Sequence, residues 1–287
     1  MTERAENMYS ADKRSEIPFG MAKFSGTITF ITGASSGIGA ALALEVARQG
    51  GDVALVARRE ERLRKLAREI ESMGRQALAV PCDVSKDDDL QAAAEKTIDR
   101  FGCIDYVVAN AGFGVGGRFE KLTIDDYRRQ FETNVFGVLK TVYATREHLA
   151  ASRGCLVIIG SINGYIATPR LSAYSMSKFA LHGLAESLWH EFRRQGVGVV
   201  LIVPGYVRTE IRQVDKLGVR HPEIKDRIPA WLQISCDEAA RQIARAMHRR
   251  ERERIITAQG KIAVFLKRHL PRLMSRLISR MGAKGLI

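Results

Sequence analysis

The sequence lacks long apolar segments. No stretch approaches the roughly 18 consecutive apolar residues that a membrane-spanning helix needs, which excludes such a helix. Residues 1–23 are mostly polar or charged and lack the apolar core of a signal peptide, so export is not expected. We expect these residues to form a disordered N-terminal extension and the protein to act in the cytoplasm.

Cysteine and proline are both scarce, at four and seven residues. The cysteines stand far apart without a C-x-x-C pair, which predicts reduced thiols and neither disulfides nor a metal site; they are Cys82, Cys103, Cys155 and Cys236. No Pro/Ser-rich linker and no repeat divides the chain. We therefore expect one domain over 24–258, with a substrate lid at about 206–235, and a tail at 259–287.

Acidic residues are missing from the end of the chain. From Arg241 onward lie 13 of the 45 lysines and arginines but only two of the 32 acidic residues. Most of the net charge of +13 therefore belongs to the tail and not to the fold. Without a nucleic-acid-binding fold or an aromatic stacking motif, this charge does not predict a nucleic-acid partner.

Apolar, strand-like runs alternate with longer segments of helical period. The expected strand–helix pairs are Thr27–Thr32 with Gly37–Gln49, Asp52–Ala57 with Arg59–Met73, Gln76–Cys82 with Asp87–Phe101, Ile104–Ala109 with Thr123–Ala150, and Cys155–Ile159 with Ser172–Arg194; strands at Val197–Val203 and Glu253–Thr257 follow. Strands that are apolar throughout are typical of sheets covered on both faces. The pattern predicts an α/β fold, a single doubly wound Rossmann-type parallel sheet of about seven strands.

A glycine-rich loop connects the first expected strand to its helix. Its residues are Gly33, Ser35, Ser36, Gly37, Ile38 and Gly39. Glycines allow a tight turn and close backbone approach to a pyrophosphate, whose charge a helix N-terminus stabilises. The strand–turn–helix context favours a dinucleotide site, although the glycines could also serve the turn alone.

The end of the second strand indicates which dinucleotide binds. An acidic residue there would bind the ribose hydroxyl of NAD, whereas an arginine would accept the 2′-phosphate of NADP. The sequence has Ala57, Arg58 and Arg59 and no acid. We predict NADP(H) in preference to NAD(H), with Arg58 as the first candidate. The alternative is that both arginines only coat the start of the next helix.

Tyr174 and Lys178 are four residues apart and would lie on one face of a helix. Such a pair is weak evidence alone, since it arises by chance on solvated helices. Ser161, however, ends the fifth expected strand, at the sheet edge where ligands bind.

With these motifs the chain resembles the short-chain dehydrogenase/reductase family, in its shorter, non-extended branch. The resemblance extends from about Ser25 to Glu210. The matching motifs are Thr32-Gly33-x-x-x-Gly37-Ile38-Gly39, Asp83-Val84, Asn110-Ala111-Gly112, the set Asn134, Ser161, Tyr174 and Lys178, and Pro204-Gly205-x-Val207-x-Thr209.

The resemblance implies a role for each matching residue. Tyr174 would be the general acid and base, with Ser161 bound to the substrate oxygen and Lys178 favouring the phenolate and holding the ribose. Asn134 would position a water that relays protons, and Thr209 would hold the carboxamide. The expected cofactor contacts are Gly33, Ser35, Ser36, Gly37, Ile38, Gly39, Arg58, Asp83, Val84, Asn110, Ala111, Gly112, Tyr174, Lys178, Pro204, Gly205, Val207 and Thr209. The family also implies a homodimer or homotetramer.

The lid and the tail carry spaced apolar residues. Those between residues 206 and 232 suggest a lipophilic, lipid- or steroid-like ketone or alcohol as substrate, or else ordinary packing of a helical insertion. Residues 259–287 read as a basic amphipathic helix, interrupted before Pro271. Its partner would be a membrane surface, the same protein or a second subunit.

These observations predict an NADP(H)-dependent oxidoreductase that transfers a hydride between nicotinamide and a carbonyl or alcohol. The alternative is a non-catalytic nucleotide-sensing or scaffold protein on the same fold, which the set Asn134, Ser161, Tyr174 and Lys178 argues against. A sugar-nucleotide epimerase or dehydratase is disfavoured by the loop spacing.

Overall fold

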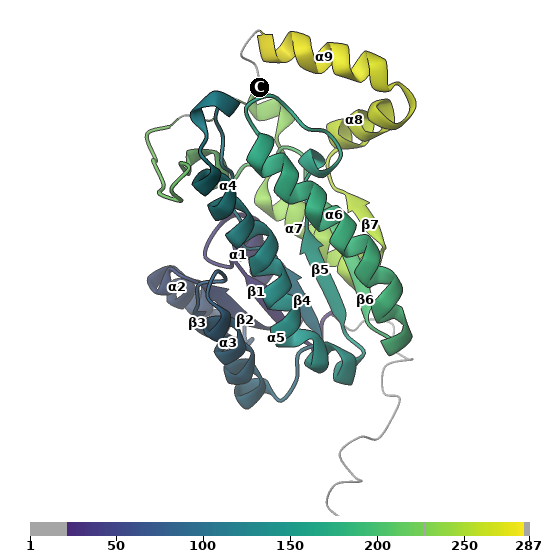
Figure 1. Ribbon diagram of the computed structural model, residues 1–287. Helices are drawn as coiled ribbons and strands as arrows, with labels where there is room; N and C mark the ends of the chain where they lie inside the picture. The colour runs from purple at the N-terminus through teal and green to yellow at the C-terminus, as the bar shows by residue number, and fades with distance from the viewer. Residues whose placement is uncertain (1–21, 225, 227, 284–287) are drawn as a thin grey trace, which may run out of the picture.

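A computed structural model describes residues 22–224, 226 and 228–283 of the chain (Figure 1). Nearly all of the predicted N-terminal extension lies outside these residues. Within the described part, every helix is too short or too polar to traverse a bilayer.

The core of the structure is a seven-stranded sheet in the order β3-β2-β1-β4-β5-β6-β7, with every neighbouring pair parallel. The strands are β1 Ile28–Thr32, β2 Asp52–Ala57, β3 Ala77–Pro81, β4 Tyr106–Ala109, β5 Cys155–Ile159, β6 Gly198–Val203 and β7 Glu253–Ile255. The predicted fold class and strand number are therefore confirmed. Because the order reverses between β1 and β4, a ligand crevice is expected beyond their carboxyl ends.

Helices cover both faces of the sheet. They are α1 Gly37–Arg48, α2 Glu60–Ser72, α3 Asp87–Phe101, α4 Ile124–Phe131, α5 Gly137–Ser152, α6 Ser172–Phe192, α7 Cys236–His248, α8 Ala258–His269 and α9 Pro271–Ala283. Apolar residues of α1, α2 and α7 form the core on one face, and those of α3, α5 and α6 form it on the other. β1, β2 and β5 are buried along their whole length, which explains their largely apolar sequence.

The single helix predicted over Thr123–Ala150 is wrong in one respect. Thr123 caps α4 through a reciprocal pair of hydrogen bonds with Asp126, but the helix gives way to a π turn, η2, at Glu132–Phe136 before α5 begins. A π turn holds one residue more than an α turn, so the apolar pattern of α4 and α5 can resemble one helix. Such turns often occur at functional sites, and this one contains Asn134.

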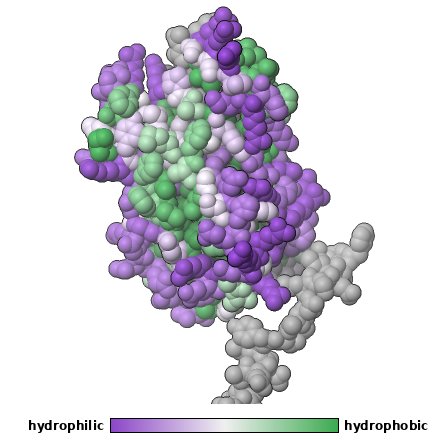
Figure 2. Space-filling view, turned by 45° about the vertical axis from the view of Figure 1, so that its right-hand side comes forward, coloured by the Kyte–Doolittle hydropathy of each residue, from purple (hydrophilic) through white to green (hydrophobic). Residues whose placement is uncertain are grey.

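The end of the π turn and the outer faces of α5 and α6 expose large apolar side chains. Phe136, Tyr143, Met176 and Phe179 are between 45% and 68% exposed. Figure 2 shows an apolar area over these helices, framed by polar surface. A patch of this kind on a helix pair marks a surface that another chain can cover.

α1 approaches β1 and β4 very closely at Gly39. A Cβ atom at Gly39 would lie 2.5 Å from the carbonyl oxygen of Gly33 and 2.6 Å from Nδ2 of Asn110. Both neighbours are held in place, one being backbone and the other a hydrogen-bonded amide. A side chain at Gly39 would therefore push α1 away from the sheet.

We expect Gly39→Ala to lower the free energy of unfolding by about 1–3 kcal/mol, the usual cost of overpacking a close contact. Gly183→Ala is the matched control, because Gly183 lies on α6 with no atom within 4 Å of its added Cβ. The control should be neutral or stabilising by up to about 1 kcal/mol, since alanine favours helix. Urea denaturation measures both, and equal stability of the two variants would contradict the packing argument.

Candidate active site

The predicted site residues collect at the carboxyl edge of the sheet, at the upper end of Figure 1. The segments that follow β1 to β6 carry most of them, whereas Asn134 lies in the π turn and Tyr174 and Lys178 lie on α6. The structure thus brings together segments that are more than a hundred residues apart in the sequence.

The loop after β1 is shaped to receive an anion. Gly33 and Gly37 adopt φ values of 66° and 59°, which residues with a side chain rarely take. Ser36 precedes α1 without capping it, and its Oγ accepts a 2.7 Å hydrogen bond from Arg59, which also donates to Oγ of Ser35. The first turn of α1, which includes Ile38, contains no acidic residue. Its N–H groups therefore remain available to a phosphate.

Thr32 and Asn110 tie this loop to β4. Oγ1 of Thr32 donates to the carbonyl oxygen of Val108 and accepts from the backbone N–H groups of Asn110 and Ala111. Nδ2 of Asn110 donates to the carbonyl oxygens of Thr32 and Gly33, at 2.9 and 3.3 Å. The amide of Asn110 thus joins two strands.

Asn134 holds the loop that follows Gly112. Its Oδ1 accepts from the N–H of Phe113 at 3.1 Å, and its Nδ2 donates to the carbonyl oxygen of Phe113 at 3.0 Å. Gln130, one turn earlier and fully buried, likewise binds N–H of Val115 and the carbonyl oxygen of Phe113. The sequence analysis missed Gln130, whose only signal is its four-residue spacing from Asn134. The loop held by these amides passes beside the ring of Tyr174 at Gly114.

Ser161 and Tyr174 face each other across the site. Ser161 is buried at the end of β5, where its Oγ accepts from the N–H of Asn163. Burial raises the pKa of Tyr174 above its usual value, while a hydrogen bond with Ser161 and the charge of Arg212 oppose the rise. The polypeptide alone therefore does not produce the lowered pKa expected for this phenol. Burial outweighs the nearby groups, and the protonated form is favoured at neutral pH.

Lys178 lies one turn below Tyr174 on α6. Its Nζ is buried, donates a 2.8 Å hydrogen bond to the carbonyl oxygen of Ile159, and lies 5.8 Å from the centre of the Tyr174 ring. Burial lowers the pKa of Lys178 to about 8. Lys178 therefore stays mostly cationic near neutrality but loses its proton at a lower pH than an exposed lysine.

The remaining predicted residues line the same edge. Ser85 donates two hydrogen bonds to Asp83, which with the nearby Arg58 keep the pKa of Asp83 low although burial opposes this. Val84 is buried against Gly137.

The predicted residues beyond β6 form a turn beside the phosphate loop. Thr209 packs against Gly37, because a Cβ atom at Gly37 would lie 3.4 Å from Cγ2 of Thr209. The other members of this turn are Pro204, whose carbonyl oxygen accepts from Ile162, Gly205, which abuts Thr257, and Val207, which pairs with Ile234.

An ion-pair cluster around Glu210 was not predicted. Its carboxylate binds Arg59 at 3.3 Å, Arg62 at 3.0 Å and Arg220 at 2.6 Å. The cluster joins the start of α2 to the segment after β6, and the hydrogen bonds and nearby charges of its arginines lower the pKa of Glu210 against the effect of burial. It borders a cavity of about 500 Å³ lined by Ser35, Ser36, Gly37, Arg62, Arg208, Thr209, Glu210, Arg212, Gln213, Asp226 and Cys236. This cavity lies against the phosphate loop and suits an anionic ligand.

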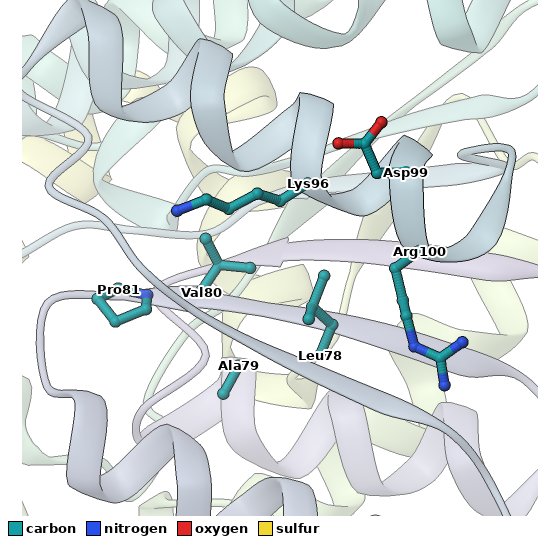
Figure 3. A pocket seen from close by; sticks show the side chains of 7 residues that line it. All are labelled: Leu78, Ala79, Val80, Pro81, Lys96, Asp99 and Arg100. Carbon is teal, nitrogen blue, oxygen red and sulfur yellow. The ribbon is translucent and has the colours of Figure 1, made fainter.

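A second hollow, of about 370 Å³, lies between β3 and α3 (Figure 3). It is lined by Leu78, Ala79, Val80, Pro81, Lys96, Asp99 and Arg100. None of the predicted site residues borders it. It is a groove at the outer edge of the sheet and does not belong to the site.

A doubly wound parallel sheet with a glycine-rich loop after its first strand, and a serine, tyrosine and lysine beyond its fifth, defines the class of nicotinamide-dependent oxidoreductases. Residues 27–218 match the family model described as short chain dehydrogenase. The chain belongs to the short-chain dehydrogenase/reductase family, as its motifs predicted.

Individual relatives support the same assignment. The chain is 33% identical over 257 residues to 11-beta-hydroxysteroid dehydrogenase A of Sesamum indicum, covering 87% of this chain and 73% of the relative. A family member of Burkholderia phymatum solved in complex with NAD has a TM-score of 0.78 at 25% identity, covering 88% and 96% of the two chains. One of Burkholderia cenocepacia solved in complex with NADP has a TM-score of 0.72 at 26% identity, covering 81% and 96%. The protein is therefore an oxidoreductase that uses a nicotinamide dinucleotide.

The low pKa of Lys178 should make stability depend on pH. In unfolded chains lysine keeps its proton up to a pKa of about 10.4, so between pH 8 and 10 the unfolded state binds more protons than the folded state. The free energy of unfolding should therefore rise in this window, by at most about 1.4 kcal/mol per pH unit relative to Lys178→Met. Urea denaturation of both proteins at several pH values measures the difference, and parallel curves would show that the ammonium is not disfavoured.

Proposed function

We propose that this protein is an NADP(H)-dependent carbonyl reductase or alcohol dehydrogenase in which Tyr174 is the general acid and base. One observation supports the proposal most directly. Tyr174, its hydrogen-bond partner Ser161 and the buried Lys178 converge at the carboxyl edge of the sheet, on the side where the phosphate loop opens. A sensor or scaffold would not need a buried lysine beside a tyrosine.

The residues present fit a dinucleotide. Gly33, Gly37 and Gly39 leave the backbone open where side chains would intrude, and the uncapped N-terminus of α1 offers N–H donors. When bound, the nicotinamide supplies or accepts the hydride. The chain provides the rest of the chemistry, which is proton transfer, orientation and stabilisation of charge.

In the direction of reduction, Tyr174 donates its proton to the carbonyl oxygen of the substrate. A phenol whose pKa lies above the ordinary value of about 10 is protonated near neutral pH, which is the form a general acid requires. Ser161 donates a hydrogen bond to the same oxygen and stabilises the charge that develops there. Asn134 acts through the loop at Phe113 and Gly114, whose backbone it fixes beside the tyrosine ring.

The arrangement of arginines supports NADP(H). Arg59 and Arg62 share the carboxylate of Glu210, whereas Arg58 is exposed at the end of β2. Within the described residues no carboxylate lies within ion-pair distance of Arg58, although the charge of Arg58 helps to lower the pKa of Asp83. Arg58 can therefore bind a 2′-phosphate without giving up an existing ion pair.

The substrate we propose is a lipophilic, lipid- or steroid-like ketone or its alcohol. The lid at 206–235 exposes Leu217, Val219, Ile224 and Trp231, and exposed apolar residues beside a polar site favour apolar ligands. The relative in Sesamum indicum is named as a hydroxysteroid dehydrogenase, which agrees with this class.

Assembly and location complete the proposal. The exposed apolar patch on α5 and α6 suits a homodimer or homotetramer, since its side chains lie on two neighbouring helices.

We place the protein in the cytoplasm, peripheral to a membrane. In support, Cys82 and Cys155 are buried, and burial raises the pKa of each thiol to about 12, as in inert reduced cysteines.

Tyr174→Phe should abolish turnover without abolishing cofactor binding. Removing a general acid typically costs about 100- to 10,000-fold in rate. NADPH oxidation with a panel of aliphatic, steroidal and long-chain ketones measures the loss, and NADPH fluorescence measures binding. Tyr143→Phe, which alters an exposed residue of α5, is the control. Turnover by Tyr174→Phe at the level of the control would refute the role of Tyr174, and failure of the unaltered protein to bind either nucleotide would refute the proposed function.

Arg58→Ala should weaken binding of NADPH by about 10- to 100-fold, as expected for one charge-assisted contact to phosphate. Binding of NADH should stay the same, because the 2′-phosphate is the only difference between the two ligands. Arg64→Ala removes an exposed arginine of α2 that pairs with Glu60 and serves as the control. If Arg58→Ala and Arg64→Ala bind NADPH equally well, another residue recognises the phosphate, and Arg59→Ala becomes the variant to compare.

A further inference from the structure

α8 is fixed beside the active site. Thr257 caps the helix, and Gly260 and Val264 are buried on its inner face. Gly260 packs against Ile162, the residue after Ser161, with 2.8 Å between a Cβ built at the glycine and Cδ1 of the isoleucine. Nε2 of Gln259 donates a 2.6 Å hydrogen bond to the carbonyl oxygen of Leu232 in the lid. The tail therefore begins in contact with both the catalytic edge and the lid.

The outer faces of the two tail helices are apolar. Ile262 and Phe265, on the side of α8 away from Gly260, are 61% and 59% exposed. On α9 and the residue before it, Leu270, Leu273 and Leu277 are 38% to 47% exposed. The main neighbour of α9 is α8, and among the described residues these side chains keep between 38% and 61% of their surface exposed. Burial within the same chain, one of the alternatives open from the sequence, is therefore not what the described residues show.

The same helices carry positive charge without compensation. Residues 258–287 contain seven lysines and arginines and no aspartate or glutamate. On α9, Arg272, Arg276 and Arg280 recur every fourth residue and so line one side of the helix, next to its leucines. An apolar stripe flanked by cations is the pattern of helices that lie in the interface of an anionic membrane. A second copy of this surface would bring like charges together, which disfavours self-association through α9.

Figure 1 places α8 and α9 at the same end of the molecule as the lid and the carboxyl edge of the sheet. Trp231 and Leu217 of the lid are 82% and 61% exposed. The lid and the tail therefore both expose apolar side chains at the end of the molecule where the site opens. A surface that bound the tail would also lie close to this entrance.

We propose that α8, α9 and the tip of the lid form one face that docks on an anionic lipid surface, so that substrate enters the site directly from the membrane. The entry of substrate from the membrane rests on the proposed function, whereas the docking itself does not depend on catalysis. The lipid-facing groups are Trp231, Ile262, Phe265, Leu273 and Leu277. The arginines of α9 bind the phosphates of the headgroups.

Sedimentation of the full chain with vesicles tests the docking. Binding should be strong on phosphatidylcholine vesicles that contain phosphatidylserine, weak on phosphatidylcholine alone, and reduced by salt. Replacing Arg272, Arg276 and Arg280 together by Gln should weaken it on the order of 100-fold, at about tenfold or less per cation. The control replaces Arg64, Arg100 and Arg128 by Gln, exposed arginines on α2, α3 and α4. Absence of binding, or equal binding by the two triple variants, would overturn the proposal. A dimer lost only in the α9 variant, without vesicle binding, would identify a second copy as the partner instead.

Quenching by brominated lipids tests the orientation. The chain has two tryptophans, and Trp189 lies 17 residues beyond the start of α6, which places it about 25 Å farther from the entrance. In a Trp189→Phe background, Trp231 should be quenched on vesicles, whereas Trp189 in a Trp231→Phe background should not. Equal quenching of the two would show that the entrance does not face the lipid.

The two proposals can fail separately. If the protein reduces a water-soluble ketone but ignores vesicles, the docking face is wrong and the oxidoreductase stands. If it binds vesicles through α9 but none of the ketones supports oxidation of NADPH, the docking face stands and the proposed function is wrong. If both hold, anionic vesicles should accelerate reduction of a membrane-dissolved ketone and leave the soluble one unaffected.

Discussion

The site depends on a small group of hydrogen bonds between β1 and β4. Thr32 and Asn110 satisfy each other's polar groups where the sheet ends, and so fix the loop at Gly33 against β4. With that loop in place, Gly39 can bring α1 almost into contact with the backbone. The N-terminus of α1 then points at the crevice between the two halves of the sheet. Every later element of the site, from the loop at Phe113 to the turn at Thr209, is built around this fixed edge, because buried polar groups must find partners wherever the chain leaves the sheet.

Much of this could be predicted from the sequence. The apolar strands alternating with helices implied the parallel sheet, and residues at strand ends, such as Ser161, had to meet at one edge. The cluster at Glu210 could not be predicted, because Glu210 lies 148 and 151 residues from Arg62 and Arg59 and no local pattern connects them. The effect of burial on the pKa of Tyr174 could not be predicted for a similar reason. It depends on how deeply the hydroxyl is buried, and burial is a property of the packed structure that residue spacing does not reveal.

Charge is distributed very unevenly over the structure. Inside, burial lowers the pKa of Lys178 to about 8, and Glu210 partly neutralises the arginines near the phosphate loop. In the tail, by contrast, the cations have no acidic residue among them. A buried charge is costly and is compensated or given up, whereas an exposed one costs little and acts at a distance. The interior charges therefore affect the chemistry and cofactor binding, whereas the charges of the tail affect which surface the protein binds.

The π turn at Glu132–Phe136 also sets the alignment of two helices. Gln130, Asn134, Val138 and Val142 are all buried, at four-residue intervals. In an ideal α-helix, positions four apart rotate by about 40° each time, so the last of them would have turned about 120° away from the first. The additional residue of the π turn takes back roughly 100° of that rotation. The asparagine of the site and the valines that pack on the sheet consequently share one line. Deleting a single residue within these five would convert the π turn into ordinary α-helix and would leave Gln130 and the two valines on that line.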